Sequence, residues 1–375
     1  MTGQLQSNED FYAVIPAGGM GTRLWPVSTS EKPKFLQSIL NNNESLLQST
    51  WERLKSLVPV ERILIVTGLA YKDEVLQQIP DLLPSNLILE PSPRDSGAAI
   101  GLAAAVINKR NPNAIIGSFH ADHVIRGLSS FSLAVTQSVI SAAAGYLSVI
   151  GIHPTRAATG FGYIKTAGPE PKIREGVGFS VERFVEKPDL DTARSYLQSG
   201  EYFWNAGIFI AKTELILEAL KKNGPDLYQS LLELAEVFGT DTCESDFERI
   251  WQSVERIAFE YPVAIPLAEE GKLVVIPGHF FWEDVGDFAA IHRMLTGGNS
   301  KALATIGDKD SIIAQDSSGL VIRRSDRIIA VTGVSQIVVV DTPDALLVTS
   351  LPNVQGVKQI VAELDKREYN PLNTN

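Results

Sequence analysis

The sequence predicts an α/β protein with a doubly wound sheet and a small C-terminal β unit. Apolar strands alternate with amphipathic helices from Phe11 to Ile152, and such alternation gives a sheet packed between helices. A glycine loop follows the first strand directly, as in folds that bind ligands at the carboxyl ends of strands. After Gly298 the pattern changes to short apolar runs separated by turns. We expect a flexible tail (1–10), a main domain (11–297) and a β-rich domain with a closing helix (298–375).

The first expected strand, Phe11 to Ile15, leads into a loop that contains three glycines. Glycine lets the backbone bend sharply and bring its N–H groups against an anion. Arg23 and Lys34 follow, and they supply the lasting countercharge that a triphosphate needs. We predict that this loop binds the phosphates of a nucleotide, through Ala17, Gly18, Gly19, Gly21, Thr22, Arg23 and Lys34.

Two common glycine loops do not fit this spacing. A Walker A loop requires Gly-Lys-Ser/Thr, but Gly21 is followed by Thr22 and Arg23. A dinucleotide loop requires a third glycine where Leu24 stands, and an acidic residue where the second strand ends at Thr67. These mismatches argue against an NAD-dependent oxidoreductase.

Strands and helices continue to alternate after this loop, which predicts a parallel, doubly wound sheet. A later stretch around Cys243 is expected to be a loop. The expected helices are 45–58, 71–79, 96–109, 130–144, 213–222 and 226–238, and the expected strands are 62–67, 86–90, 114–119, 147–152 and 272–277.

Composition excludes several classes of protein. The chain has 33 basic and 44 acidic residues, a formal net charge of −11, which argues against nucleic-acid binding. A single cysteine, Cys243, permits neither an intrachain disulfide nor a cysteine-rich zinc site, and a cytoplasmic location fits this. No apolar run approaches the roughly 20 residues that span a bilayer, so we expect no membrane partner.

The strand near 115–119 ends in His120-Ala121-Asp122-His123. Two histidines in one loop provide too few ligands for zinc, and the other histidines form no companion motif. Mg²⁺ prefers a carboxylate together with substrate phosphates and water. Asp122 is therefore the better candidate for a metal ligand.

Five later motifs follow one another along the chain. A Glu-Lys pair at a strand end, such as Glu186-Lys187, is most often a surface ion pair when taken alone. The motifs are ILEPSPRDS (88–96), ATGFGYIK (158–165), RFVEKPD (183–189) and YFWNAGIFI (202–210), with FFWEDVGDF (280–288) after them.

Together with the glycine loop, these motifs resemble the sugar-1-phosphate nucleotidylyltransferases, and most closely the mannose-1-phosphate guanylyltransferases. The resemblance implies the nucleotide-diphospho-sugar transferase type of fold, with a Rossmann-like mixed sheet. It also implies that GTP and mannose 1-phosphate are converted to GDP-mannose and pyrophosphate, with Mg²⁺ as the cofactor. Arg23, Lys34 and Lys187 are then the catalytic cations.

The resemblance also assigns the site residues. It implies that the purine contacts Glu90, Arg94, Asp95 and Ser96, although the family has Asn-Thr where this chain has Asp95-Ser96. Two further departures are Asp287-Phe288 in place of Ser-Trp, and Glu260-Tyr261 in place of an aspartate-containing segment. By the same resemblance, sugar hydroxyls contact Gly162, Glu186 and Asn205, the sugar phosphate contacts Lys187, and Mg²⁺ binds Asp122 and Asp284.

The C-terminal apolar runs predict a small all-β unit or the start of a left-handed β-helix. We expect it to assemble a homodimer and to contribute no catalytic group. Two alternative functions remain open: a glucose-1-phosphate thymidylyl- or uridylyltransferase, and a non-catalytic regulatory subunit that binds nucleotide sugar. The runs are 311–314, 320–322, 328–332, 337–340 and 346–349, followed by a helix with Val354, Val357, Val361 and Leu364 on one side.

Overall fold

A computed structural model describes residues 9–40, 44–173, 177–240 and 243–367. The expected tail lies outside the described residues as far as residue 8. The chain divides into two compact units, each built from separate stretches, whereas the sequence predicts contiguous domains. The sheet unit contains the stretch up to Gly18, Thr50–Ala121 and Ile125–Trp282, and the loop unit contains Gly19–Ser49, Asp122–Val124 and the stretch from Glu283 onward.

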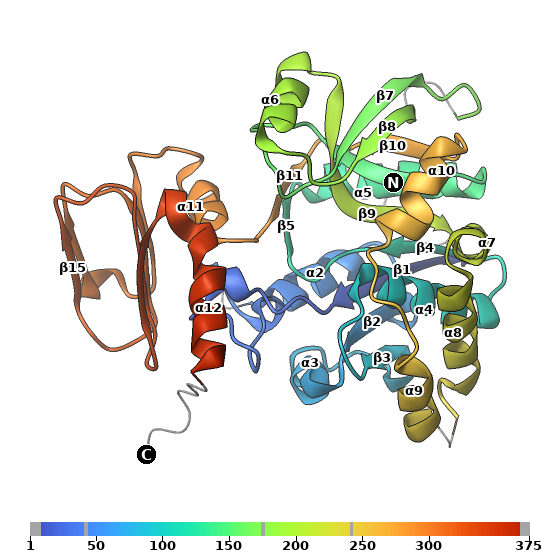
Figure 1. Ribbon diagram of the computed structural model, residues 1–375, viewed down its shortest axis with the longest axis horizontal. Helices are drawn as coiled ribbons and strands as arrows, with labels where there is room; N and C mark the ends of the chain where they lie inside the picture. The colour runs from blue at the N-terminus through green and yellow to red at the C-terminus, as the bar shows by residue number, and fades with distance from the viewer. Residues whose placement is uncertain (1–8, 41–43, 174–176, 241–242, 368–375) are drawn as a thin grey trace. The chain divides into compact units, whose positions relative to one another are not determined.

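A nine-stranded sheet forms the centre of the sheet unit, in the order β3-β2-β1-β4-β9-β6-β10-β8-β7 (Figure 1). β1 to β4 run parallel, with Ala13 opposite Ile63 and Phe11 opposite Ile115. β9 is antiparallel to β4 and β6, so the sheet is mixed, as the resemblance implies, and not parallel throughout, as the alternation alone predicts. The strands are Phe11–Ala17 (β1), Ile63–Gly68 (β2), Leu87–Glu90 (β3), Ile115–Ser118 (β4), Leu147–Ile152 (β6), Tyr163–Pro169 (β7), Phe179–Val185 (β8), Tyr202–Lys212 (β9) and Leu273–Pro277 (β10).

Small residues let the helices pack closely in the sheet unit. A Cβ on Gly101 of α4 would lie 2.6 Å from Cδ1 of Leu231 on α8, so a larger residue there would force the side chain of Leu231 to move. α4 also contacts β1 and β2, while α5 contacts β6 and β9. The helices are Lys72–Gln78 (α3), Asp95–Arg110 (α4), Leu128–Ala143 (α5), Leu190–Ser199 (α6), Thr213–Asn223 (α7), Pro225–Val237 (α8) and Ile265–Glu269 (α10).

The prediction of a loop around Cys243 is wrong, because helix α9 spans Cys243–Trp251. Phe247, Ile250 and Trp251 are buried at helical spacing, and the ring of Phe247 stacks on that of Trp251. This helix is short, and its polar first turn hides the apolar spacing from a reading of the sequence.

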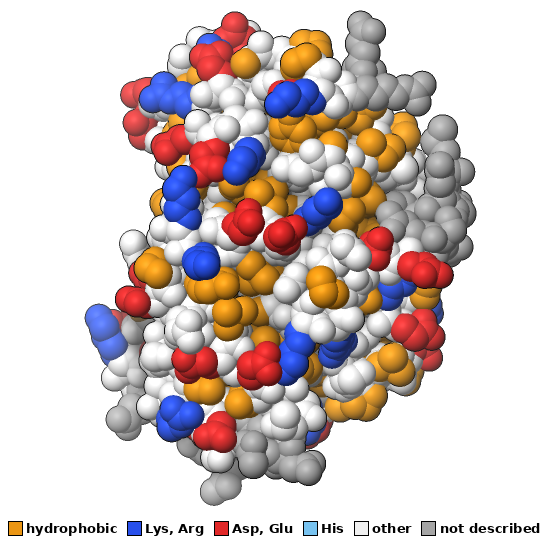
Figure 2. Space-filling model, turned by 90° about the vertical axis from the view of Figure 1, so that its right-hand side faces the viewer, with side chains coloured by type: hydrophobic (Ala, Val, Ile, Leu, Met, Phe, Trp, Pro, Cys, Tyr) orange, Lys and Arg blue, Asp and Glu red, His pale blue; other side chains and the backbone are white. Residues whose placement is uncertain are grey.

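The face in Figure 2 carries acidic, basic and apolar side chains interspersed, and the basic ones do not gather on it. Among the described residues, no helix combines the length and apolar character needed to cross a membrane.

Parallel strands stack in the loop unit, and successive turns of chain add strands to two small sheets. β12, β14 and β16 pair in parallel in one sheet, and β13 pairs with β15 in the other. All five predicted apolar runs form strands, and β12 is an additional strand that the sequence did not predict. The elements are Leu303–Ile306 (β12), Ile312–Gln315 (β13), Gly319–Arg323 (β14), Ile329–Thr332 (β15), Ile337–Asp341 (β16) and Leu346–Ser350 (β17), with helices Leu46–Lys55 (α2, which the unit boundary divides), Phe288–Thr296 (α11) and Val357–Lys366 (α12).

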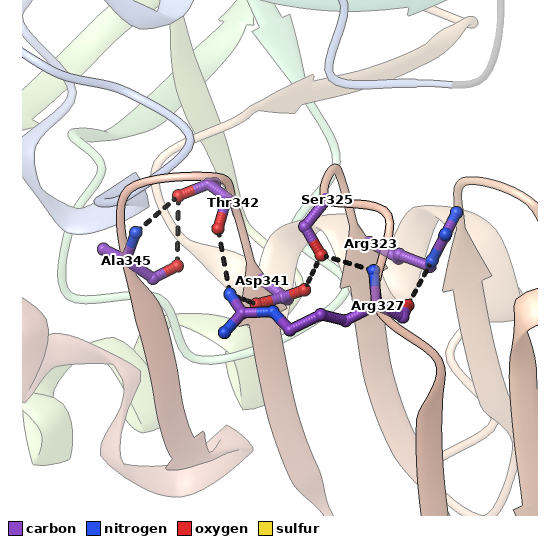
Figure 3. Close-up of polar contacts among 6 residues, drawn as sticks. All are labelled: Arg323, Ser325, Arg327, Asp341, Thr342 and Ala345. Carbon is purple, nitrogen blue, oxygen red and sulfur yellow. Dashed lines mark hydrogen bonds and ion pairs between the residues drawn. The ribbon is translucent and has the colours of Figure 1, made fainter.

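A buried carboxylate connects two turns of this stack (Figure 3). Asp341, at the end of β16, accepts hydrogen bonds from Oγ of Ser325 and Nη2 of Arg327. Arg327 also donates to the backbone oxygen of Thr342. Because Asp341 is only 2% exposed, these partners supply the compensation that a buried charge requires.

The glycine-loop segment shares a hydrophobic core with the stacked strands. Leu24, Val27 and Ile39 belong to the same buried cluster as residues of β14, β16 and α11. The members from these elements include Leu320, Val338, Val340, Phe288 and Ile291. The packing of the β stack therefore fixes the backbone of the predicted phosphate loop.

Candidate active site

Glycine is needed where the predicted phosphate loop approaches Lys34. Gly21 has φ +66°, a left-handed conformation, and a Cβ there would lie 2.8 Å from Cβ of Lys34. A Cβ on Gly19 would lie 3.9 Å from Cε of Lys34 and 3.7 Å from Oδ2 of Asp122. The lysine side chain therefore lies along the loop, and the absence of a side chain at Gly21 makes room for it.

The ammonium group of Lys34 lies between two carboxylates. Its Nζ is 2.5 Å from Oδ2 of Asp122 and 3.1 Å from Oδ1 of Asp284. Burial alone lowers the pKa of Lys34, but the two carboxylates more than offset this effect and raise it above its usual value. Lys34 is therefore a fixed cation, as the sequence analysis requires.

Asp122, His123 and Asp284 offer ligand atoms that all lie within 4.8 Å of one another. The structure thus brings together the two aspartates that are predicted to bind Mg²⁺, although they lie far apart in the chain. No role is predicted for His123 from the sequence, where the two histidines of this loop are considered only as zinc ligands. His123 is buried beside the carboxylates, and a set of one histidine with two carboxylates emerges only from the fold.

Arg23 lies in a 3₁₀ turn, Thr22–Leu24, directly after the glycines. The side chain of Leu24 is buried, whereas that of Arg23 reaches solvent. Its Nη1 donates to Oε1 of Gln355, which lies just before α12, at 3.3 Å. No sequence motif indicates this partner, since the two residues lie near opposite ends of the chain.

In the sheet unit, Glu90 ends β3 with its carboxyl group buried. Its Oε1 has no hydrogen-bond partner within the described ranges. Its Oε2 would lie 3.7 Å from a Cβ on Gly18, so a glycine of the predicted loop lies beside it. Burial, with a smaller contribution from the charge of Asp95, raises the pKa of Glu90 to about 7. A buried carboxyl without a partner is a strong candidate for contact with a ligand.

The other predicted base contacts lie at the start of α4. Asp95 has φ +70°, unusual for a residue other than glycine, and its Oδ1 accepts from the backbone N–H of Ser96. Oγ of Ser96 accepts from the N–H of Phe259 at 2.9 Å, and Nη2 of Arg94 donates to the oxygen of Gln252. Asp95 and Ser96 thus shape this turn, and Ser96 attaches it to the segment before Glu260.

The predicted sugar-binding residues form one cluster in the sheet unit. Oε1 of Glu186 is 2.9 Å from Nζ of Lys187, and Oε2 is buried with no partner in the described part of the chain. A Cβ on Gly162 would lie 2.5 Å from this Oε2. Lys187 has φ +48°, a sparsely populated conformation that is common at functional sites.

Glu260 joins this cluster, although the sequence showed it only as a partial match. Nδ2 of Asn205 donates to its Oε1 at 3.2 Å, and Oδ1 of Asn205 accepts from the N–H of Gly207. Burial, followed by the nearby charge of Glu186, raises the pKa of Glu260 to about 7. Glu260 begins a short π-helix (Glu260–Ala264), which is also frequent at functional sites.

Two family models match the chain. "Nucleotidyl transferase" matches residues 12–301, and "MannoseP isomerase/GMP-like beta-helix domain" matches residues 310–364. The mannose-1-phosphate guanylyltransferase RfbM of Salmonella typhimurium is 35% identical over 368 residues, covering 96% of this chain and 74% of that protein. The mannose-1-phosphate guanylyltransferase of Escherichia coli K12 is 32% identical over 94% and 73%. A crystal structure named "mannose-1-phosphate geranyltransferase", from Thermus thermophilus, matches with TM-score 0.82 and 29% identity, over 95% of this chain and 99% of that one.

Proposed function

Because the chain belongs to the nucleotidyl transferase family, among the mannose-1-phosphate guanylyltransferases, we propose that it joins GTP to mannose 1-phosphate, giving GDP-mannose and pyrophosphate. The observation that carries this proposal is the cluster of Lys34 with Asp122 and Asp284 beside the glycine loop. Phosphoryl chemistry needs charge neutralisation and positioning more than it needs covalent catalysis.

Residues of this chain divide the work of binding in the proposed reaction. Arg23 and Lys34 neutralise the triphosphate, and Glu90 accepts hydrogen bonds from the purine edge. Lys187 binds the phosphate of the sugar substrate, and Asn205 and Glu186 bind its hydroxyl groups. The proposed reaction requires that the attacking oxygen be held in line with the α-phosphorus, because such positioning removes much of the entropic part of the barrier.

The donor set fits a magnesium ion. Two carboxylates that keep some exposure provide hard oxygen ligands and leave room for water and phosphate, as Mg²⁺ prefers. Asp122 and Asp284 would hold the ion, with His123 beside them. When bound, Mg²⁺ withdraws charge from the phosphoryl oxygens.

The attacking group needs no general base from the protein. The second pKa of a phosphate monoester is about 6, so at neutral pH the attacking oxygen of mannose 1-phosphate is already mostly ionised. The proposed mechanism therefore assigns no proton transfer to His123 or to either aspartate.

A substrate matrix tests the function. Initial rates of pyrophosphate release are measured with GTP, ATP, UTP and dTTP against the 1-phosphates of mannose, glucose and N-acetylglucosamine. GTP with mannose 1-phosphate should have the highest kcat/KM, because a buried group that pairs with the purine edge is left unpaired by another base. A tenfold preference for UTP or dTTP would refute the guanylyl assignment. No turnover of any pair, with GDP-mannose still bound, would favour a regulatory subunit.

We also propose that the β stack forms a homodimer. Ile328, Val334, Leu346 and Val348 are exposed and line one open groove, with Arg327 and Asp341 also lining it. Exposed apolar surface of this kind is typical of an interface. Val348→Asp should halve the mass seen by light scattering, whereas Ile360→Asp, an exposed site on α12, should not. A mass unchanged by Val348→Asp would count against this interface.

A further inference from the structure

The C-terminal segment supplies a contact to the guanidinium of Arg23. The backbone of Arg23 is fixed because its neighbour Leu24 is buried in the core of the loop unit. The long side chain reaches solvent, where an arginine ordinarily samples many conformations. Its hydrogen bond to Oε1 of Gln355 selects among them.

Gln355 is itself held in place. Its Nε2 donates to Oδ2 of Asp287 at 2.6 Å, while the other carboxylate oxygen of Asp287 accepts from the N–H of Ala290 and caps helix α11. The amide thus has its oxygen toward a cation and its nitrogen toward an anion, the orientation that electrostatics favours. Val354, the residue before Gln355, and Val357, two residues after it, are buried in the same core as Leu24.

Asp287 departs from the serine that is common at this position in the family that the sequence resembles. A serine hydroxyl could also cap α11, but it offers a single oxygen. A carboxylate has two oxygens, so it can cap the helix and hold Gln355 at the same time. Asp287 therefore caps α11 and holds Gln355 at the same time.

We propose that Gln355 is a positioning residue, which aims Arg23 at the triphosphate of GTP. This inference rests on the proposed function, because it assumes that Arg23 binds the nucleotide. It gives the region after residue 298 a role in nucleotide binding besides the expected assembly, although Gln355 itself touches no substrate.

The first test compares Gln355→Leu with Gln359→Leu in the full chain. Gln359 is an exposed residue of α12, so it controls for the same change nearby. Gln355→Leu should lower kcat/KM for GTP about tenfold, as loss of one hydrogen bond to a charged group predicts, while KM for mannose 1-phosphate and the melting temperature match the control. Calorimetry should show weaker GTP binding without sugar phosphate.

The second test is a rescue. Gln355→Glu alone places a carboxylate against Asp287 and should lower GTP affinity, whereas adding Asp287→Asn restores a donor toward residue 355 and keeps the α11 cap. The double variant should regain most of the wild-type kcat/KM. Equal behaviour of Gln355→Leu and Gln359→Leu, or a double variant no better than Gln355→Glu, would overturn the inference. An inactive wild type would instead refute the proposed function.

Discussion

Nζ of Lys34 lies 2.5 Å from Oδ2 of Asp122, so a buried ammonium group already neutralises one of the carboxylates that we propose bind magnesium. Asp284 is a second partner of the same nitrogen, at 3.1 Å. A divalent cation that binds both carboxylates competes with this ammonium. We therefore expect these two carboxylates to bind a divalent cation only weakly while Lys34 remains paired with them.

Lys34→Met should therefore change metal binding by the enzyme without nucleotide. The variant leaves two carboxylates unneutralised, so it should bind Mn²⁺ at least about tenfold more tightly, and lose roughly 3–5 kcal/mol of stability that the metal partly restores. Isothermal calorimetry and melting curves with added metal measure both effects. Lys32→Met, at an exposed position, is the control. Mn²⁺ affinity equal to that of the wild type would contradict the competition.

Asp122→Asn and Asp284→Asn should each abolish turnover while the fold is kept, because each removes a charged metal ligand at constant volume. The loss should be on the order of several kcal/mol of transition-state stabilisation. Pyrophosphate release at saturating Mg²⁺ is the assay, and Asp344→Asn, an exposed aspartate of the loop unit, is the control. Rates near wild type in both active-site variants would remove the metal assignment.

Gly162→Ala should impair sugar binding selectively. The new Cβ would lie 2.5 Å from Oε2 of Glu186 and 3.2 Å from Cβ of Asn205, so both side chains must move. KM for mannose 1-phosphate should rise about tenfold, as a penalty of roughly 1.4 kcal/mol gives, with little change in KM for GTP. Gly160→Ala is a close control, because nothing lies within 4 Å of its Cβ position. If the two variants have the same KM, Glu186 and Asn205 do not bind the sugar.

Glu90→Gln should make stability less dependent on pH. Burial, helped by Asp95, raises the pKa of Glu90 to about 7 in the folded protein, above the value of about 4.3 in an unfolded chain. The folded state favours the protonated carboxyl. Its contribution to the free energy of unfolding is therefore fully present below the pKa of the unfolded chain and is lost as pH rises through the pKa of the folded protein. The variant should therefore equal the wild type near pH 4 and exceed it above pH 7, by up to roughly 3 kcal/mol.

Urea unfolding without nucleotide, at several pH values between these limits, measures this difference. Glu218→Gln, at an exposed position in the sheet unit, serves as the control. A difference between Glu90→Gln and the wild type that does not grow with pH would mean that Glu90 is ionised in the fold.

Sequence patterns predicted the sheet and most helices well, because hydrophobic periodicity and glycine position are local properties. They also predicted Asp122 and Asp284 as a pair, but only through resemblance to a family. The contact of Lys34 with both could not be predicted, since it depends on tertiary packing. The same holds for Glu260, which the sequence shows only as a weak match, and for Gln355, which has no motif around it.

The C-terminal region shows a second reason why some contacts could not be predicted from the sequence. Its short apolar runs predicted strands correctly, but a run of valines does not reveal which other segment it will bury. The structure places Leu24, Val27 and Ile39 in the core that Leu320 and Val338 complete. Which segments pack together in a core depends on the whole fold. The packing of the phosphate loop against the β stack therefore cannot be predicted from a single motif.

This shared core also affects how the protein folds during its synthesis. A chain made from its N-terminus presents Leu24, Val27 and Ile39 long before β14 and β16 leave the ribosome. Until then these apolar side chains lack their native partners, so the incomplete chain is prone to aggregate or to bind a chaperone. The phosphate loop can reach its native packing only after β14 and β16 have been synthesised. We therefore expect a chain that lacks these strands to show no GTP-dependent activity.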